Sequence, residues 1–391
     1  MSNDTQPEIR FPGFTEAWEQ RKVFEISKVT YGGGTPKTNT KEFWNGNIPW
    51  IQSSDLEINR LFNVSPKKKI TNEAIKKSAA KIIPPNSIAI VTRVGVGKLA
   101  LMPFEYATSQ DFLSLSELQI DSYFGIFSLY SMLQKELKNI QGTSIKGMTK
   151  SDLLEKKVTI PKKYEEQQKI GNFFKQLDDT IALHQRKLDL LKETKKGFLQ
   201  KMFPKNGAKV PEIRFPGFTE DWEQRKLGEL TKIKTGSSDL QDADAKGIYP
   251  FFVRSEIIER SNRYIFDGEA ILIPGEGRLG EIYHYINGKF DFHQRVYKIS
   301  DFQYSDTDGK YILYYMQKYF KKHAMKYTVK ATVDSLRLPM LTEFDIKIPS
   351  LDEQRAISSF FSNLDQSITL HQRKLDLLKE TKKGFLQKMF V

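Results

Sequence analysis

The chain has 391 residues, 39% of them hydrophobic and 12% aromatic, which is enough apolar material for two domains with cores of their own. It has no cysteine, which excludes disulfides and thiolate metal sites. No run approaches the roughly 20 apolar residues that span a bilayer, and the first ten residues lack a basic, apolar leader, so we expect a cytoplasmic protein with no membrane partner. Lys and Arg outnumber Asp and Glu by 61 to 48, a net charge of +13, which predicts an anionic partner.

Two segments of the chain occur twice. Residues 7–22 return as 211–226 with a single change, from Ala17 to Asp221, and residues 183–203 return unchanged as 370–390. The long stretches between these copies barely match. A period of about half the chain is far longer than a solenoid repeat, so the sequence predicts a duplicated unit of repeat segment, mixed domain and long helix. Near-identical frames around divergent middles favour recognition of a linear partner in two parts.

The divergent middles mix strand-like and helix-like patterns. Short β-branched runs such as 87–92 occur in the same regions as helix-like stretches such as 123–138. We therefore predict an α+β protein with two recognition domains of mixed α/β structure. Two long antiparallel helices that form a coiled coil would separate them, in a pseudo-twofold internal repeat. In chain order the predicted parts are a repeat segment at 1–22, a first domain at 23–161, a central long helix at 162–204, a linker with the second repeat segment at 205–226, a second domain at 227–349 and a C-terminal long helix at 350–391.

Both predicted helices carry a heptad pattern. Their seam positions alternate in steps of four and three residues, and an amphipathic helix of this length buries its stripe most simply against the other copy. Copies related by a pseudo-twofold axis run antiparallel. The first seam contains Ile170, Phe174, Leu177, Ile181, His184, Leu188, Leu191, Lys195, Phe198 and Met202; the second contains Ile357, Phe361, Leu364, Ile368, His371, Leu375, Leu378, Lys382, Phe385 and Met389.

No catalytic or metal-binding motif is convincing in this sequence. Residues 83–86 contain the two prolines of an adenine-methyltransferase motif but neither flank, and residues 95–98 lack the spacing and the hydroxyl of a phosphate-binding loop. The acidic cluster Asp239, Asp242 and Asp244 is interpreted as a solvated loop. We therefore predict no catalytic residue, no metal and no cofactor bound by this chain.

Several motifs, in order along the chain, resemble those of specificity subunits of Type I restriction-modification systems. They are IPWIQSSDL from Ile48, ATSQDF from Ala107, GTSIKGMTKSDLLEKKVTIP from Gly142, EEQQKI from Glu165 and DEQRAI from Asp352. The resemblance covers essentially the whole chain. It implies a non-catalytic DNA-binding subunit with two target recognition domains, each reading one half of an asymmetric, bipartite site in double-stranded DNA.

The resemblance also implies protein partners. Two methyltransferase subunits would dock on the helices, which set the gap between the half-sites, and two restriction and translocation subunits would complete the complex. S-adenosylmethionine, ATP and Mg are expected on these partners, which would supply the endonuclease and adenine-methyltransferase activities. Identity of the helix repeats favours two equivalent docking surfaces.

Phosphate contacts supply affinity and position, whereas contacts to base edges supply sequence choice. Candidate readers are therefore polar side chains in glycine-flanked loops, and an Arg can bind guanine O6 and N7 in bidentate fashion. In the first domain they are Thr35, Lys37, Ser53, Ser54, Arg93, Lys98, Ser144 and Lys146. In the second they are Ser237, Ser238, Arg254, Ser255, Arg278, Arg295, Lys330 and Thr332.

Other interpretations stay open at the level of the sequence. A specificity subunit of a related system, in which one partner chain both cleaves and methylates, would have the same organisation. A basic coiled-coil scaffold that binds acidic proteins would bind DNA without regard to sequence. A standalone nuclease or methyltransferase would be active as a purified chain.

Overall fold

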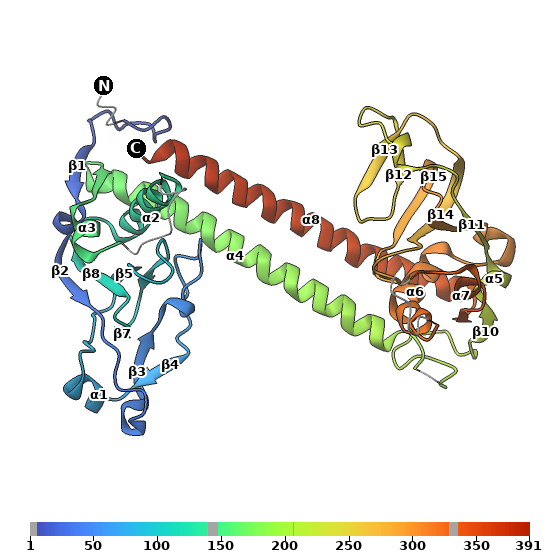
Figure 1. Cartoon of the computed structure of the whole chain (residues 1–391), viewed down its shortest axis with the longest axis horizontal. Helices are drawn as coiled ribbons and strands as arrows, with labels where there is room; N and C mark the ends of the chain where they lie inside the picture. The colour runs from blue at the N-terminus through green and yellow to red at the C-terminus, as the bar shows by residue number, and fades with distance from the viewer. Residues whose placement is uncertain (1–5, 140–147, 206, 328–334) are drawn as a thin grey trace. The chain divides into compact units, whose positions relative to one another are not determined.

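The computed structural model describes residues 6–139, 148–205, 207–327 and 335–391. The chain forms two compact units: unit 1 contains Met1–His184 and Arg373–Val391, and unit 2 contains Gln185–Gln372. The division falls inside both long helices, α4 (Tyr164–Lys201) and α8 (Leu351–Met389), so each unit combines a mixed domain with part of each helix (Figure 1). Among the described residues, no helix is long and apolar enough to cross a membrane.

Unit 1 contains a four-stranded sheet in the order β2-β8-β5-β6, a three-stranded sheet in the order β4-β3-β7, and a pair formed by β1 and β9. Every residue of β5 is buried, as the apolar run 88–91 predicts for a central strand. The strands are β1 (Glu19–Lys22), β2 (Ser27–Gly32), β3 (Trp44–Ile51), β4 (Lys68–Ile70), β5 (Ser87–Val91), β6 (Leu99–Met102), β7 (Ala107–Thr108), β8 (Phe112–Leu118) and β9 (Lys157–Ile160), and the α-helices besides α4 are α1 (Asn72–Lys77), α2 (Ser122–Asn139) and α3 (Lys150–Glu155).

Unit 2 contains one six-stranded sheet in the order β11-β16-β14-β15-β12-β13 and a pair formed by β10 and β17. The amphipathic helix α6 packs against β14 and buries nine of its residues. The strands are β10 (Glu223–Lys226), β11 (Lys232–Thr235), β12 (Tyr249–Phe252), β13 (Ile258–Ser261), β14 (Phe266–Pro274), β15 (His284–Phe292), β16 (Val296–Ser300) and β17 (Asp345–Ile348), and the α-helices besides α8 are α5 (Leu227–Leu230), α6 (Gly309–Ala324) and α7 (Leu338–Thr342).

The two units share one pattern of strand pairing. In unit 1, β3 lies parallel to β7 with Ile51 opposite Thr108; in unit 2, β12 lies parallel to β15 with Phe252 opposite Phe292. The pairs β2-β8, β8-β5 and β5-β6 correspond in the same way to β11-β16, β16-β14 and β14-β15. The difference lies in β15, which is continuous, whereas its counterpart in unit 1 is broken into β6 and β7 and leaves two sheets.

The two helices run antiparallel within each unit. In unit 1, Phe173 packs on Phe385 with ring centroids 5.2 Å apart; in unit 2, Phe198 packs on Phe360 at 5.0 Å. The end of α8 enters the core of unit 1, and the end of α4 enters the core of unit 2. All predicted seam residues are buried or half-buried. The predicted fold class, with mixed domains repeated around two long antiparallel helices, is confirmed.

Each copy of the repeat segment binds both helices of its own unit. Arg10 makes a bidentate ion pair with Glu166 at the start of α4, and Arg214 makes the same pair with Glu353 at the start of α8. At the other helix, Ile9 N–H donates to Lys388 O at 3.0 Å and Ile213 N–H donates to Lys201 O at 2.9 Å. Since terminal helix carbonyls lack partners inside the helix, this segment caps one helix while it anchors the other.

Candidate functional site

Loops from distant parts of unit 1 meet where β3, β5 and β7 end. Ser109 N–H donates to Ile51 O at 2.9 Å, and Thr92 N–H donates to Asp111 O at 2.7 Å. Gly33 packs so closely on this junction that a Cβ there would lie 1.9 Å from Ser109 O, so only glycine fits. The loop after β2 is thereby held against the loops after β3, β5 and β7.

The same junction occurs in unit 2. His293 N–H donates to Phe252 O at 2.9 Å, and Gly275 N–H donates to Arg295 O at 2.8 Å. A Cβ at Gly236 would lie 1.9 Å from Phe292 O. Each domain therefore presents a cluster of loops on an equivalent backbone frame, and we call these clusters the unit 1 and unit 2 loop clusters.

Most predicted readers of the first domain belong to the unit 1 loop cluster. Lys98 Nζ donates to Ser53 O at 3.0 Å, which joins the loops after β3 and β5. Both of these residues are half-buried. Thr35, Lys37, Ser54 and Arg93 are exposed. Ser144 and Lys146 lie outside the described residues.

Two lysines of this cluster, Lys81 and Lys150, were not predicted from the sequence. Burial lowers the pKa of Lys150, and the charges of Arg93 and Lys81 lower it further. A Cβ at Gly32 would lie 2.7 Å from Lys150 Nζ, so this side chain packs against the glycine loop after β2. The signal was present, because Lys150 lies in the segment from Gly142 that carries the family resemblance.

In unit 2 the three predicted arginines are brought together with two carboxylates. Arg254 donates to Glu276 at 3.1 Å and Arg295 donates to the other oxygen of the same carboxylate, while Arg278 pairs with Glu256. Partial burial acts to raise the pKa of Glu276, but the hydrogen bonds from the two arginines prevail and lower it. The arginines are exposed, so carboxylates hold their guanidinium groups in place at the surface.

The serines of unit 2 differ in accessibility. Ser237 is exposed, and Ser255 is half-buried with its hydroxyl bonded to the backbone of Ile257. Ser238 is fully buried: its hydroxyl donates to Asp291 and accepts from Arg263 at 2.9 Å. A direct DNA contact by Ser238 is not compatible with this arrangement, and we withdraw it from the set of readers. Lys330 and Thr332 lie outside the described residues.

The equivalent positions of the two clusters carry opposite charges. The backbone pair formed by Thr92 and Asp111 corresponds to the pair formed by Gly275 and Arg295. An aspartate in unit 1 thus occupies the place of an arginine in unit 2. The charge is also reversed at the residue after Thr92, since Arg93 in unit 1 corresponds to Glu276 in unit 2. One frame therefore presents two different patterns of donors and acceptors.

The outer faces of the helices are alike in the two units. Unit 1 exposes Leu183 of α4 and Leu377 of α8, and unit 2 exposes Leu190 and Leu370; each side chain is between 57% and 66% exposed. Leu183 corresponds to Leu370 in the helix repeat, and Leu190 to Leu377. Each unit therefore presents the same pair of apolar side chains. Among the described residues, no group of three or more His, Asp or Glu is placed to hold a metal.

Two copies of one frame, each with its own pattern of charged loop residues, define a duplicated protein with two different loop clusters. Residues 15–193 and 219–380 match the family described as the Type I restriction modification DNA specificity domain. The chain is 25% identical to the Type I restriction enzyme MjaIX specificity subunit of Methanocaldococcus jannaschii, over 95% of this chain and 92% of the relative. It is also 25% identical to the EcoprrI specificity subunit of Escherichia coli, over 89% and 88%.

A solved structure has the same fold. It is the crystal structure of the S subunit of a Type I restriction-modification system from M. genitalium, with a TM-score of 0.72, 16% identity and 99% of each chain covered. The chain belongs to the family of Type I restriction-modification specificity subunits. Such subunits are named for DNA specificity and not for catalysis.

Proposed function

We propose that this chain selects a bipartite, asymmetric DNA sequence, with the unit 1 and unit 2 loop clusters each reading one half. The observation that carries the proposal is the reversal of charge at equivalent positions of one backbone frame. An exposed arginine such as Arg295 can donate to two acceptors on guanine, whereas Asp111 at the same place can only accept from a base amine. Two such clusters prefer different half-sequences.

The clusters also contain the positive charge that DNA binding requires. Unit 1 contributes Lys81, Arg93 and Lys150, and unit 2 contributes its three arginines. The carboxylates of Glu256 and Glu276 hold the arginines before DNA arrives, which lowers the entropy lost on binding. DNA must displace or share these ion pairs, so poor acceptors at the base edge are rejected.

Catalysis belongs to other subunits in this proposal. Two methyltransferase subunits would bind the two equivalent faces marked by the exposed leucines, and two restriction and translocation subunits would join them. S-adenosylmethionine, ATP and Mg would be bound by those partners. The support is the identity of the helix repeat in both copies, outward side chains included.

Methylation mapping tests the proposal. The chain would be expressed with its methyltransferase in cells that lack other adenine methylation, and their DNA sequenced by a long-read method that detects methyladenine. We expect one split motif with two different halves. A continuous or palindromic motif, or methylation without sequence preference, would contradict the proposal.

A further inference from the structure

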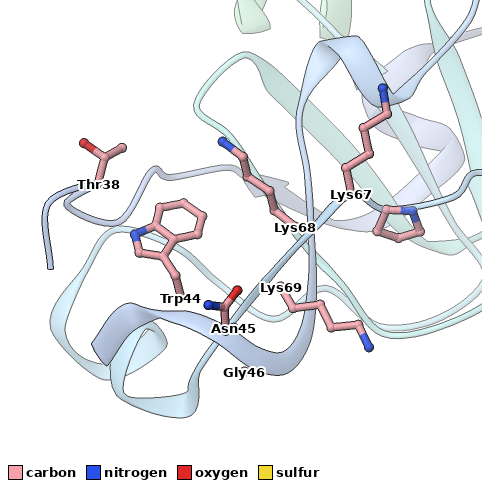
Figure 2. A pocket seen from close by; sticks show the side chains of 8 residues that line it. Thr38, Trp44, Asn45, Gly46, Lys67, Lys68 and Lys69 are labelled. Atoms are coloured by element: carbon pink, nitrogen blue, oxygen red, sulfur yellow. The ribbon is translucent and has the colours of Figure 1, made fainter. Parts of the chain in front are cut away.

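A basic hollow in unit 1 lies beside the loop that carries Thr35 and Lys37. Two indole groups join them: Trp44 Nε1 donates to Lys37 O at 3.2 Å, and Trp50 Nε1 donates to Gly34 O at 3.1 Å. The hollow is thus continuous with the unit 1 loop cluster. It is lined by Thr38, Trp44, Asn45, Gly46, Pro66, Lys67, Lys68 and Lys69 (Figure 2).

The three consecutive lysines are exposed and uncompensated. Within the described part of the chain, none of them has an acidic group within 4.0 Å, unlike the arginines of unit 2. Lys68 Nζ is held above two indole rings instead, 5.6 Å from the centroid of Trp44 and 5.8 Å from that of Trp50. Figure 2 shows its side chain on the same side as Trp44, while Lys67 and Lys69 extend elsewhere. Neighbouring cations without partners attract an anionic ligand.

A bulge in β3 builds this arrangement. Trp44 and Ile48 both pair with Ile70, so the residues between them leave the ladder, and Asn45 adopts a left-handed φ of 62°. The bulge turns Trp44 back onto Trp50, with ring centroids 5.2 Å apart and planes at 88°. Bulges of this kind re-aim side chains. Here the bulge places one indole below Lys68.

Of these three lysines, only Lys69 has a cationic equivalent among the described residues of unit 2. Lys68 lies opposite Trp50 in β3, and Glu259 lies opposite Phe251 at the matching place in β12. The positions of Lys67 and Lys69 correspond to Ile258 and Arg260. The guanidinium of Arg260 donates to the carbonyls of Gly247 and Ile248.

We propose that Lys67, Lys68 and Lys69 bind phosphates of the DNA backbone beside the half-site read by unit 1, and that the other half-site lacks this clamp. The inference rests on the proposed function. DNA that meets Thr35 and Lys37 passes the adjoining hollow, whereas an acidic protein segment would have to compete with DNA for the same surface. Phosphate contacts carry no sequence information, so the lysines add affinity and leave the recognised sequence unchanged.

Salt-dependent binding tests the clamp in the complex with the methyltransferase. Affinity for a duplex containing the mapped site would be measured from about 50 to 200 mM salt for the wild type and for K67Q/K68Q/K69Q. Each lost phosphate contact makes the slope of log K against log salt less negative by about 0.9, so we expect a change of about 2 to 3. Hydroxyl-radical protection should disappear only beside the unit 1 half-site, and the methylated sequence should not change.

The matched control places cations on unit 2. I258K/E259K should make the slope more negative and extend protection beside the second half-site. An unchanged slope and footprint in the glutamine variant would overturn the clamp. Loss of the methyltransferase from that variant with an unchanged slope would also overturn it, and would assign the hollow to an acidic protein partner. Failure of the wild-type complex to prefer its mapped site would overturn the proposed function itself.

Discussion

Lys382 places its ammonium nitrogen 2.5 Å from Asp178 Oδ1, and Lys195 repeats this relationship with Asp365 at 2.6 Å. The first pair joins α8 to α4 within unit 1 and the second joins α4 to α8 within unit 2. Their burial differs: the side chain of Asp178 is 15% exposed and that of Asp365 is 39% exposed. The same ionic contact is therefore made in a drier environment in unit 1.

Lys382→Met should destabilise the protein more than Lys195→Met. Removing one partner of a buried pair leaves an uncompensated charge. We therefore expect the free energy of unfolding, measured with urea, to fall by about 2–3 kcal/mol in Lys382→Met and by about 1 kcal/mol in Lys195→Met. Burial raises the pKa of Asp178, although the charge of Lys382 acts to lower it. The folded protein therefore takes up this proton at a higher pH than the unfolded chain, and acidification favours folding in that window. The loss in Lys382→Met should shrink from pH 7 to pH 5; a constant loss would argue against a buried carboxylate.

Lys298 should make stability rise with pH in the alkaline range. Its side chain is 5% exposed, and burial lowers its pKa to about 8 from 10.5. Between these values the unfolded chain holds a proton that the folded protein has lost, so the free energy of unfolding increases with pH. Lys298→Met should increase the free energy of unfolding by about 2 kcal/mol at pH 7 and should reduce its rise with pH. Lys246→Met, in the exposed loop before β12, is the control and should leave the rise intact.

Arg295→Ala and Arg93→Ala should each alter one half of the methylated motif. Arg295 lies in the unit 2 loop cluster and Arg93 in that of unit 1. Loss of a bidentate base contact reduces discrimination by about 1–3 kcal/mol, or roughly 5- to 150-fold at one base pair. Methylation mapping of both variants provides the measurement. A change in both halves caused by one substitution would show that the clusters do not read independently.

Acidic substitutions of the exposed leucines should remove one methyltransferase at a time. L183D/L377D disrupts the apolar pair of unit 1, and L190D/L370D that of unit 2. Because buried interface charges oppose association, native mass spectrometry should detect one bound subunit for each double variant and two for the wild type. The exposed polar pair Q176D/N363D is the control and should keep two. Full occupancy in both leucine variants would place the docking surface elsewhere.

Four residues inserted into the middle of either long helix should lengthen the unread gap in the DNA motif. A helix grows by about 6 Å for four residues, which corresponds to roughly one to two base pairs. Both half-sequences should stay the same, because the loop clusters are untouched. Methylation mapping that found altered half-sequences with the original gap would contradict a role of the helices in setting the spacing.

The sequence predicted the structure best where side chains recur at a short, regular spacing along the chain. The heptad seam was predictable because seam side chains recur every three or four residues, and the pairing of the copies follows from their identity. The strand order was not predictable, because the pairing of Trp50 with Ala107 joins residues far apart in the chain. Loop residues could be chosen by composition, but their partners could not. Ser238 is buried by Asp291, 53 residues away, and Glu276 was missed because acidic residues were not considered as supports for arginines.

The break between β6 and β7 gives the two loop clusters different backbone support. In unit 2, the strand that leads into Arg295 is part of one six-stranded sheet, so the backbone pairs of that sheet oppose opening of the loop cluster. In unit 1, the corresponding loop follows a two-residue strand on a separate three-stranded sheet. Local opening requires less energy where fewer backbone pairs must separate. The unit 1 loop cluster should therefore deform at a lower energetic cost than the unit 2 loop cluster when a ligand binds.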